Sequence, residues 1–420
     1  MKRIINNFLL VLFVLIGVII VHALVRYATC PIYKFPEPRP FAGNTWFNPY
    51  QDMNPDWFKA NFQVQSLSWL GATDGRNRTE DVVEQYKKLG YDIITISDYQ
   101  YINKMKDMDI SFIPVYEHGY NMKKRHQVVI GAKNVLWHEY MFWQNEHHKQ
   151  NILNLLKEEN PFVAIAHPRF MHGYESGNMK ILTNYDAIEV LNHYRKSVAL
   201  WDEALSAGRA VWLIGDDDSH NVHDPNQTGV CWTMINAETT AEKDVLSALK
   251  KGQMYGVEGR NAVNDNSLLF ASVVENTYRI QLKNPAGQIR FIGQDGKLVS
   301  VTENQNYAEL NLSQGDTYIR AEIENSGSTM YLNPIFRING DVISRPAAII
   351  DEPKTTLLRT AIVLFILSLW FGGRFFYFNL YPARSAAYRR PIRIPRPIFA
   401  FFRTIQNILR RKLQFGRKNS

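Results

Sequence analysis

Two long apolar segments lie near the two ends of the chain. Residues 8–21 (FLLVLFVLIGVIIV) carry no charge, and the apolar stretch continues through His22 to residue 25. Residues 360–373 (TAIVLFILSLWFGG) form the second segment, which is followed by aromatic residues as far as 381. Because about 20 apolar residues cross the ~30 Å of hydrocarbon in a bilayer, both segments predict membrane helices. A cleaved signal peptide is the alternative for the first segment, although Arg26 stands where a small-residue cleavage site would lie, and a buried helix of a soluble domain is the alternative for the second.

Between these two segments the spacing of apolar positions predicts first an α/β region and then an antiparallel β region. Residues 79–90 and 239–252 each begin with Thr, carry acidic residues in the first turn and end at Gly, which predicts two helices. Five short apolar runs have the composition of buried parallel strands, at residues 61–65, 93–97, 112–116, 162–166 and 211–215. From residue 267 to residue 341, short alternating runs are separated by Asn-Pro, Asp-Gly and Gly-Asp turns, which indicates a small antiparallel β domain.

The basic residues are concentrated at the ends of the chain. Sixteen of the 48 Lys and Arg residues flank the apolar segments or lie in residues 384–420, which contain no Asp or Glu. The remaining 32 stand against all 40 acidic residues, so residues 31–354 carry a formal net charge of −8. A nucleic-acid-binding domain needs a basic face, and this charge argues against one. The two cysteines, Cys30 and Cys231, are too few for a four-thiolate zinc site.

The same distribution of charge predicts a membrane topology. Lys2 and Arg3 precede the first apolar segment, and the basic tail follows the second. By the positive-inside rule both termini are expected in the cytoplasm, with the acidic body outside the inner or plasma membrane. Within the tail, residues 397–415 place apolar residues between Arg and Lys at helical spacing, which suits a helix lying on anionic lipid. A solvated basic tail is the alternative.

Polar side chains able to bind a metal or a phosphate follow the five predicted parallel strands. They are Gln65, Asp98, Glu117, His167 and the residues 216–220. In a closed α/β barrel the carboxyl ends of the strands meet at one mouth, so these groups would meet although they are far apart in the sequence. One carboxylate after a strand often caps the next helix, but this mixture of His, Asp and Glu indicates a metal site. No P-loop, nucleophile elbow or Rossmann glycine motif is present.

These segments, in this order, resemble the PHP family, the polymerase and histidinol phosphatase type metallohydrolases. The family's usual marks are H-x-H-S, S-D-G, T-D-H, a lone Glu, a His on a strand, A-H-P and a final D-S-H. The corresponding positions here are Q-V-Q-S at 63–66, T-D-G at 73–75, S-D-Y at 97–99, Glu117, His126, A-H-P at 166–168 and D-S-H at 218–220. The resemblance covers residues 58–259. It implies a distorted (β/α)7 barrel that holds two or three metal ions, usually Zn, Mn or Fe.

The resemblance carries one intact ligand set to this chain. Glu117 matches the bridging carboxylate, and with His126 and His167 it forms a two-histidine, one-carboxylate set that leaves a position open for water. The expected cofactor is one or two divalent ions (Zn, Mn or Fe), or none if the metal site is degenerate.

The family's other metal positions are altered. Asp218 matches a further ligand, but its usual histidine partners are replaced by Gln63 and Gln65, whose neutral amide oxygens are poor ligands for zinc. A third site would draw on His220, Asp74, Asp98 and the residue after Asp98. The family has a histidine at that last position, and this chain has Tyr99. The resemblance thus implies one complete site and two impaired ones.

Two functions are open at this point. The first is a membrane-anchored, metal-dependent hydrolase, in particular a phosphoesterase, in which His220 is the proton donor and Asp218 takes part in catalysis. Asn192, at the end of the run AIEVLN, would position the substrate or else form a turn. The second function is that of a pseudoenzyme, which keeps the fold and binds a ligand or a partner protein. The expected substrate is a small molecule, or a lipid or polysaccharide phosphate, and no nucleic-acid partner is expected.

The expected architecture is an α/β fold in six parts. Residues 1–30 form a transmembrane anchor, 31–57 a linker, 58–262 the PHP-like barrel, 263–350 a β-sandwich-like domain, 355–381 a second transmembrane helix and 382–420 a basic cytoplasmic tail. The run LNPIFR at 332–337 resembles the closing segment of extracytoplasmic family members, so the resemblance extends into the β domain.

Overall fold

The computed structural model describes residues 2–380, except residues 107, 261–265 and 341. The basic tail predicted at 382–420 therefore lies outside the described residues. The helices are α1 (Lys2–Thr29), α2 (Thr79–Lys88), α3 (Glu146–Leu156), α4 (Ser176–Ile181), α5 (Val198–Ser206), α6 (Glu242–Lys251) and α7 (Glu352–Leu380), with short 3₁₀ turns η1 (Trp69–Gly71), η2 (Phe170–His172) and η3 (Gln294–Gly296). The helices predicted at 79–90 and 239–252 are confirmed as α2 and α6.

One sheet contains five buried strands in the order β5-β6-β7-β8-β9. Their bounds are β5 (Val115–His118), β6 (Gln127–Ile130), β7 (Phe162–Ile165), β8 (Ala187–Leu191) and β9 (Trp212–Gly215). β7, β8 and β9 are parallel, whereas β6 is antiparallel to both of its neighbours. β6 reverses because only residues 119–126 connect it to β5, and a parallel crossover needs about a dozen residues or more.

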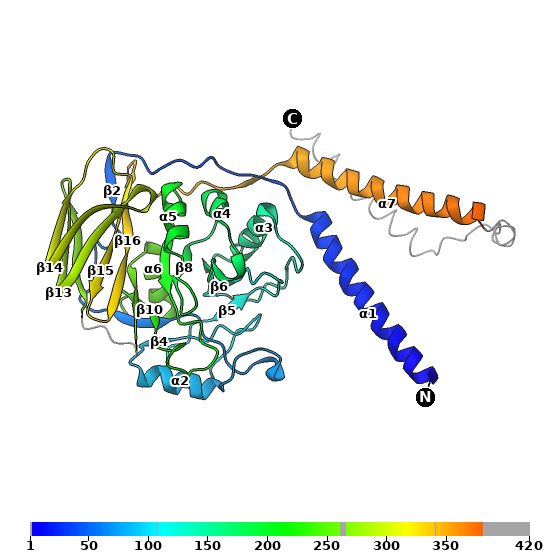
Figure 1. Cartoon of the computed structure of the whole chain (residues 1–420), viewed down its shortest axis with the longest axis horizontal. Coiled ribbons are helices and arrows are strands. Elements are labelled where there is room, and N and C mark those ends of the chain that lie inside the picture. The colour runs from blue at the N-terminus through cyan, green and yellow to red at the C-terminus, as the bar shows by residue number, and fades with distance from the viewer. Residues whose placement is uncertain (1, 107, 261–265, 341, 381–420) are drawn as a thin grey trace. The chain divides into compact units, whose positions relative to one another are not determined.

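The other large sheet runs in the order β12-β13-β15-β16-β11-β10-β3-β4, with β14 beside β13 and β2 beside β16. Its strands are β2 (Thr45–Phe47), β3 (Phe58–Asn61), β4 (Ile93–Ile94), β10 (Cys231–Ile235), β11 (Met254–Gly259), β12 (Leu268–Val274), β13 (Thr277–Gly293), β14 (Lys297–Asn311), β15 (Tyr318–Asn325) and β16 (Ser328–Ile338). β3 and β4 are parallel, and the β region joins the α/β region through the antiparallel pair β16–β11. Figure 1 shows β13 to β16 as the long strands of the fold, with α4 and α5 beside the shorter strands.

Two isolated parallel bridges connect the strands of the two sheets. Tyr99, after β4, pairs with Glu117 in β5, and Val64, after β3, pairs with Ser219, after β9. A backbone hydrogen bond from Gln65 N to Ser219 O (2.9 Å) supports the second bridge. The result is a mixed α/β fold whose curled sheets bring the carboxyl ends of β3, β4, β5 and β9 together.

A buried ion-pair network ties the β region to α5. Arg320 of β15 is only 2% exposed. Its Nε and Nη2 donate to the two carboxylate oxygens of Asp202 in α5 (2.7 and 2.8 Å), and Nη1 donates to Glu322 (2.7 Å). The guanidinium also lies over the Trp201 ring, 5.2 Å from its centroid. This bidentate geometry is specific and strong, so it holds α5 and β15 in one arrangement.

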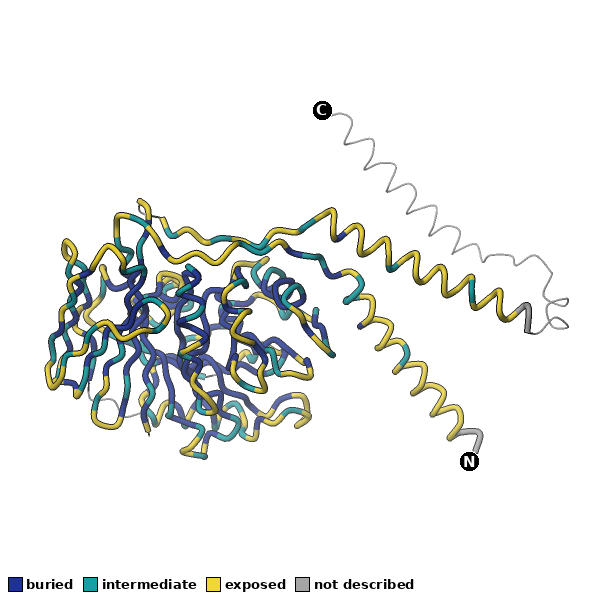
Figure 2. Tube along the Cα trace, turned by 45° about the horizontal axis from the view of Figure 1, so that its top comes forward, coloured by how far each residue is buried: buried dark blue, intermediate teal, exposed yellow. Residues whose placement is uncertain are grey.

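The apolar segments near the two ends are helical. Ile5–Thr29 of α1 (25 residues, mean hydropathy 3.2) and Glu352–Tyr377 of α7 (26 residues, mean hydropathy 1.7) are each long and apolar enough to cross a membrane. Most side chains along α1 are exposed (Figure 2). The predicted linker contains β1 (Tyr33–Lys34), which follows α1 and pairs antiparallel with β17 (Ile349–Ile350), the strand that precedes α7.

Candidate metal site

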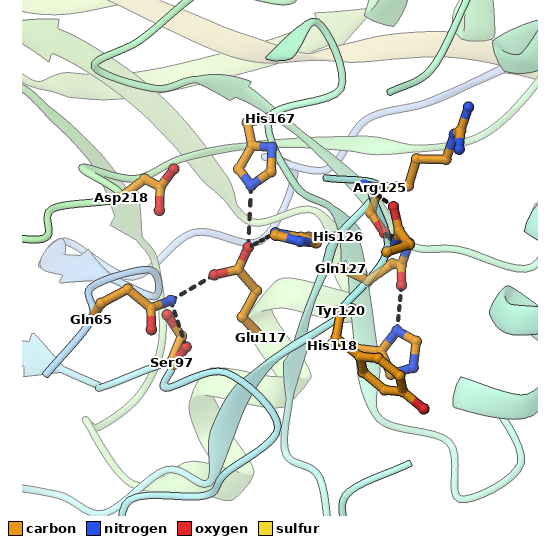
Figure 3. Close-up of polar contacts among 12 residues, drawn as sticks. Gln65, Ser97, Glu117, His118, Tyr120, Arg125, His126, Gln127, His167 and Asp218 are labelled. Atoms are coloured by element: carbon orange, nitrogen blue, oxygen red, sulfur yellow. Dashed lines mark hydrogen bonds and ion pairs between the residues drawn. The ribbon is translucent and has the colours of Figure 1, made fainter. Parts of the chain in front are cut away.

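Three residues form a buried cluster near the carboxyl ends of β5 and β7 and the amino end of β6, and we call Glu117, His126 and His167 the ligand cluster (Figure 3). Glu117 lies within β5, His126 directly precedes β6 and His167 follows β7. Glu117 Oε1 contacts His126 Nδ1 closely and lies 3.1 Å from His167 Nε2. One ligand atom from each residue lies within 4.8 Å of the other two. The antiparallel β5-β6-β7 arrangement therefore places the three predicted ligands around one point.

The electrostatics of the ligand cluster favour a cation. Burial by itself raises the pKa of Glu117, but the charges and hydrogen bonds of the two histidines outweigh it and hold that pKa well below its usual range. Burial lowers the pKa of His126. At His167 burial is opposed by the hydrogen bond to Glu117 and by the charge of Asp218, which together raise its pKa. An ionised carboxylate thus lies between two imidazoles, the charge pattern of a metal ligand set.

Gln65 lies beside the ligand cluster, and Gln63 precedes Gln65 by two residues. Gln63 and Gln65 are both fully buried. Gln65 Nε2 donates to Glu117 Oε2 (2.6 Å) and to Ser97 O (2.9 Å), as Figure 3 shows. Gln65 Oε1 and both polar side-chain atoms of Gln63 have no hydrogen-bond partner among the described residues. The carboxylate oxygen of Glu117 that does not face the histidines is therefore occupied by an amide N–H.

Asp218 faces the ligand cluster from another side, and Glu189 of β8 lies behind it. Glu189 is fully buried, and its two oxygens accept from His167 N (2.5 Å) and Asn192 Nδ2 (3.0 Å). Asn192 Nδ2 also lies 3.2 Å from Asp218 Oδ2, so this residue orients two carboxylates. Burial and the charges of Asp218 and Asp216 raise the pKa of Glu189 well above its usual range. Sequence reasoning missed Glu189, although an acidic residue within the apolar run AIEVLN was a signal, because a buried carboxylate needs a partner.

His220 lies between Asp218 and Asp74. Its Nε2 is 3.7 Å from Asp218 Oδ1, and its Nδ1 is 3.1 Å from Asp74 Oδ1. Burial raises the pKa of Asp218 to about 6. Burial lowers the pKa of His220, but the carboxylates of Asp74 and Asp218 outweigh it and raise that pKa overall. A histidine whose pKa is raised by neighbouring carboxylates holds its proton more tightly and can act as a general acid.

The remaining predicted residues, Asp98 and Tyr99, have packing and hydrogen-bonding partners of their own. The Asp98 carboxylate accepts from Ser66 N (2.7 Å), Ser66 Oγ (2.7 Å) and Asn103 Nδ2 (3.2 Å), which joins the loop after β3 to the loop after β4. The Tyr99 ring packs edge-on against His126, with centroids 5.4 Å apart, and lies 6.5 Å from the His220 ring. Tyr99 therefore fills the space between these two histidines.

The loop that carries Asp218 is held by its two neighbours. Asp216 and Asp217 are fully buried. Asp216 Oδ1 accepts from Phe62 N (2.6 Å). The Asp217 carboxylate accepts from several groups: Gly229 N, Val230 N, Cys231 N and Tyr86 Oη, at 2.8, 2.8, 2.9 and 2.9 Å. These bonds position Asp218 without giving Asp216 or Asp217 a place among the ligand atoms.

The residues present fit a divalent metal ion. Two imidazoles and a carboxylate are ligands typical of Zn and Fe sites. Several buried polar atoms around the same point have no hydrogen-bond partner within the described residues: both side-chain atoms of Gln63, Gln65 Oε1, His167 Nδ1 and Asp218 Oδ1. Because buried polar atoms are nearly always satisfied, an ion with its bound water would supply partners that this region lacks.

Comparison with known proteins finds distant likeness to solved structures. No protein-family model matches the chain, and no curated protein matches it at a significant level. Among solved structures, the chain is similar to a two-domain protein from Bacteroides vulgatus described as containing a predicted PHP-like metal-dependent phosphoesterase. The identity is 12%, the match covers 76% of this chain and 99% of that one, and the TM-score is 0.38.

Proposed function

We propose that this protein is a membrane-anchored, metal-dependent hydrolase whose substrates are phosphoesters. The observation that carries the proposal is the buried ligand cluster with unpaired polar atoms around it. In a purely structural cluster each unpaired buried atom would cost about 1–3 kcal/mol without return. The motif order, which resembles that of PHP-type phosphatases, supports a phosphoester as the substrate class.

The chain's own residues can move the protons that hydrolysis requires. When bound at the ligand cluster, a divalent ion supplies water of lowered pKa and neutralises charge on a phosphoryl oxygen. Asp218, whose pKa burial raises to about 6, is oriented by Asn192 and would accept a proton from the attacking water. His220, whose pKa is raised by Asp74 and Asp218, would donate a proton to the leaving group.

One observation favours a second candidate, a pseudoenzyme that binds a ligand or a partner without turnover. Gln63 and Gln65 stand where the resembled family has histidines, and Gln65 presents an N–H to Glu117 Oε2 at 2.6 Å. A cation beside Glu117 Oε2 would face the amide hydrogens of Gln65. A second ion at that position would therefore require the Gln65 amide to rotate so that its Oε1 faces the ion. This candidate holds one ion or none.

We also propose a distorted (β/α)7 barrel, in which β6 runs antiparallel to its neighbours, and the two-pass topology. The strands β3 to β9 form a ring when the two isolated bridges are counted as its closing pairs. Since β1 pairs with β17, the chain returns to the end of α1 before it enters α7, which suits two spans with both termini in the cytoplasm. Lipid would then be a partner through both helices and the basic tail, and a lipid or polysaccharide phosphate is the expected substrate.

The test measures metal content and phosphoester hydrolysis on the same detergent-purified, full-length protein. His167→Gln removes one ligand. His118→Gln is the matched control, because His118 is a buried histidine of β5 that bonds Gln127 and His138 O on the other side of the strand (Figure 3). We expect about one equivalent of Zn, Mn or Fe in the wild type and in His118→Gln.

In His167→Gln we expect both the metal and the hydrolysis of phosphomonoesters or phosphodiesters to be lost. A folded wild type that holds no metal and hydrolyses neither ester would refute the hydrolase. A wild type that holds its metal but hydrolyses nothing, on a broad set of phosphoesters, would favour the pseudoenzyme.

A further inference from the structure

A group of large apolar side chains is exposed on the loops near the site. Trp69 and Leu70 lie on η1 after β3, and the others lie on the loops on either side of β6. We call this group the aromatic lip, and its members are Trp69, Leu70, Tyr120, Met122, Trp137 and Trp143. Leu70 is fully exposed, and Met122 and Trp143 are 69% and 57% exposed. Trp137 contacts both Trp69 and Tyr120, and an exposed apolar surface of this kind usually marks a surface of interaction.

The aromatic lip is joined to the last turn of α1. Arg26 Nη1 donates to Tyr120 Oη (3.0 Å). Tyr27 stacks on Trp143 with ring centroids 4.4 Å apart, and its hydroxyl donates to Trp143 O (2.9 Å). These contacts fix one edge of the lip at the point where the apolar span Ile5–Thr29 ends.

The opposite edge of the aromatic lip reaches the wall of the metal site. Tyr120 Oη donates to Trp137 O (2.8 Å), and the Trp137 ring packs edge-on against Trp69 at 6.0 Å. Trp69 Nε1 donates to the carbonyl oxygen of Tyr99 (2.7 Å), whose ring packs against His126. A continuous path of contacts therefore leads from α1 to a residue that touches the ligand cluster.

The backbone of η1 is strained in order to present this surface. Trp69 and Leu70 have φ values of 52° and 56°, in the left-handed region that large side chains rarely adopt. Leu70 gains no burial within the protein from this conformation, because it is fully exposed. The strain of this loop is explained if another molecule buries the Leu70 side chain.

The composition of the lip fits a lipid headgroup layer. Trp and Tyr are the residues enriched where proteins meet the membrane–water interface. Lys123 is exposed beside Met122, and Lys124 Nζ lies over the Tyr99 ring, 5.3 Å from its centroid. Lysines at this position can pair with lipid phosphates while the apolar side chains enter the interface.

We infer that the aromatic lip is a membrane-contact surface, which inserts into the headgroup region of the bilayer that α1 crosses. The metal site then lies close to the lipid surface, and its substrate would be a phosphate group presented by the membrane. This inference rests on the membrane anchoring in the proposed function and extends it to the body of the protein. A protein partner would be an alternative occupant, and the test below distinguishes it.

The test places single spin labels on the full-length protein in proteoliposomes that contain anionic lipid. Cys30 and Cys231 are buried, so labelling is directed to introduced cysteines, with the unmodified chain as the blank. Leu70→Cys and Met122→Cys report on the lip. Leu298→Cys on β14 is the exposed reference, at 58% exposure, and Gly17→Cys reports on α1.

The measurement compares collision of each label with apolar oxygen and with a water-soluble nickel chelate. We expect the ratio of oxygen to nickel accessibility to be several-fold higher at residues 70 and 122 than at 298, and highest at 17. If the label at residue 17 lies in the bilayer but the accessibility ratios at residues 70 and 122 equal that at residue 298, the aromatic lip does not contact the membrane. The proposal that α1 anchors the protein would still hold. If 70 and 122 are shielded from both reagents, a protein covers them and the inference also fails.

A water-exposed label at residue 17 would overturn the anchor itself, and the lip with it. Metal content measured on the same samples reports on the ligand cluster independently of membrane depth. The failure of the hydrolase proposal and the failure of the lip therefore give different results.

Discussion

Replacing Glu117 by glutamine removes one negative charge from the ligand cluster and keeps the size of the side chain. The carboxylate is fully buried, its Oε1 faces two imidazoles and its Oε2 accepts from Gln65. In Glu117→Gln the cation would meet only neutral ligands, and the new NH₂ group would face either the histidines or the amide of Gln65.

The magnitude follows from this geometry. Loss of a residue that merely supports a metal ligand weakens metal binding about 10–100-fold. Because Glu117 would contact the ion itself, we expect a loss of at least about 100-fold, which is about 2.7 kcal/mol. The loss should arise from the missing charge rather than from unfolding, since the two side chains have nearly the same shape.

The assay titrates metal-stripped, full-length protein in detergent with Zn²⁺ in competition with a chromophoric chelator. Glu139→Gln is the matched control, because Glu139 is also buried (1% exposed) and its carboxylate accepts from amides, including those of Asn121 and Gln144. Wild-type affinity in Glu117→Gln would refute the reasoning. An equal loss in Glu139→Gln would assign the effect to general destabilisation and refute it as well.

Three further predictions concern stability, metal number and pH. Arg320→Ala leaves Asp202 buried without its cation and should lower the free energy of unfolding by about 3–5 kcal/mol; an unchanged Tm in detergent would contradict the buried network. Gln63→His combined with Gln65→His adds two imidazoles to the loop that follows β3 and should raise the metal content to about two equivalents by elemental analysis; an unchanged content would show that no second ion binds there. Metal retention should fall as the pH is lowered, because the ion binds neutral imidazole and the pKa of His167 is raised, so protons compete from a higher pH than at an ordinary histidine. Equilibrium dialysis between about pH 5 and pH 8 checks this, and a flat profile would contradict it.

The order of the motifs was sufficient to predict the ligand cluster, because each ligand directly follows or precedes a short apolar run. Glu117, His126 and His167 lie together in the structure as the sequence predicted. Glu189 and its bonds to His167 and Asn192 were missed, since one acidic residue in an apolar strand does not reveal which groups share its face.

The amino-acid sequence by itself determined the features that depend on neighbouring residues. Hydrophobic length made α1 and α7 long apolar helices, acidic first turns and the glycines that follow located α2 and α6, and apolar runs marked the buried strands. The threonines expected to cap α2 and α6 are not their N-caps, which are Arg78 and Ala241. These signals are local, because each arises from the preference of a short segment for burial or for one backbone geometry.

Only the tertiary structure decided which distant groups meet. The reversal of β6, the hydrogen bond from Gln65 to Glu117 and the ion pair between Arg320 and Asp202 depend on how the sheets curl and pair. The path from α1 to Tyr99 through the aromatic lip likewise joins loops that are far apart in the sequence. Such contacts are set by the packing of the whole chain, because the direction of a side chain from a loop depends on every element packed against that loop.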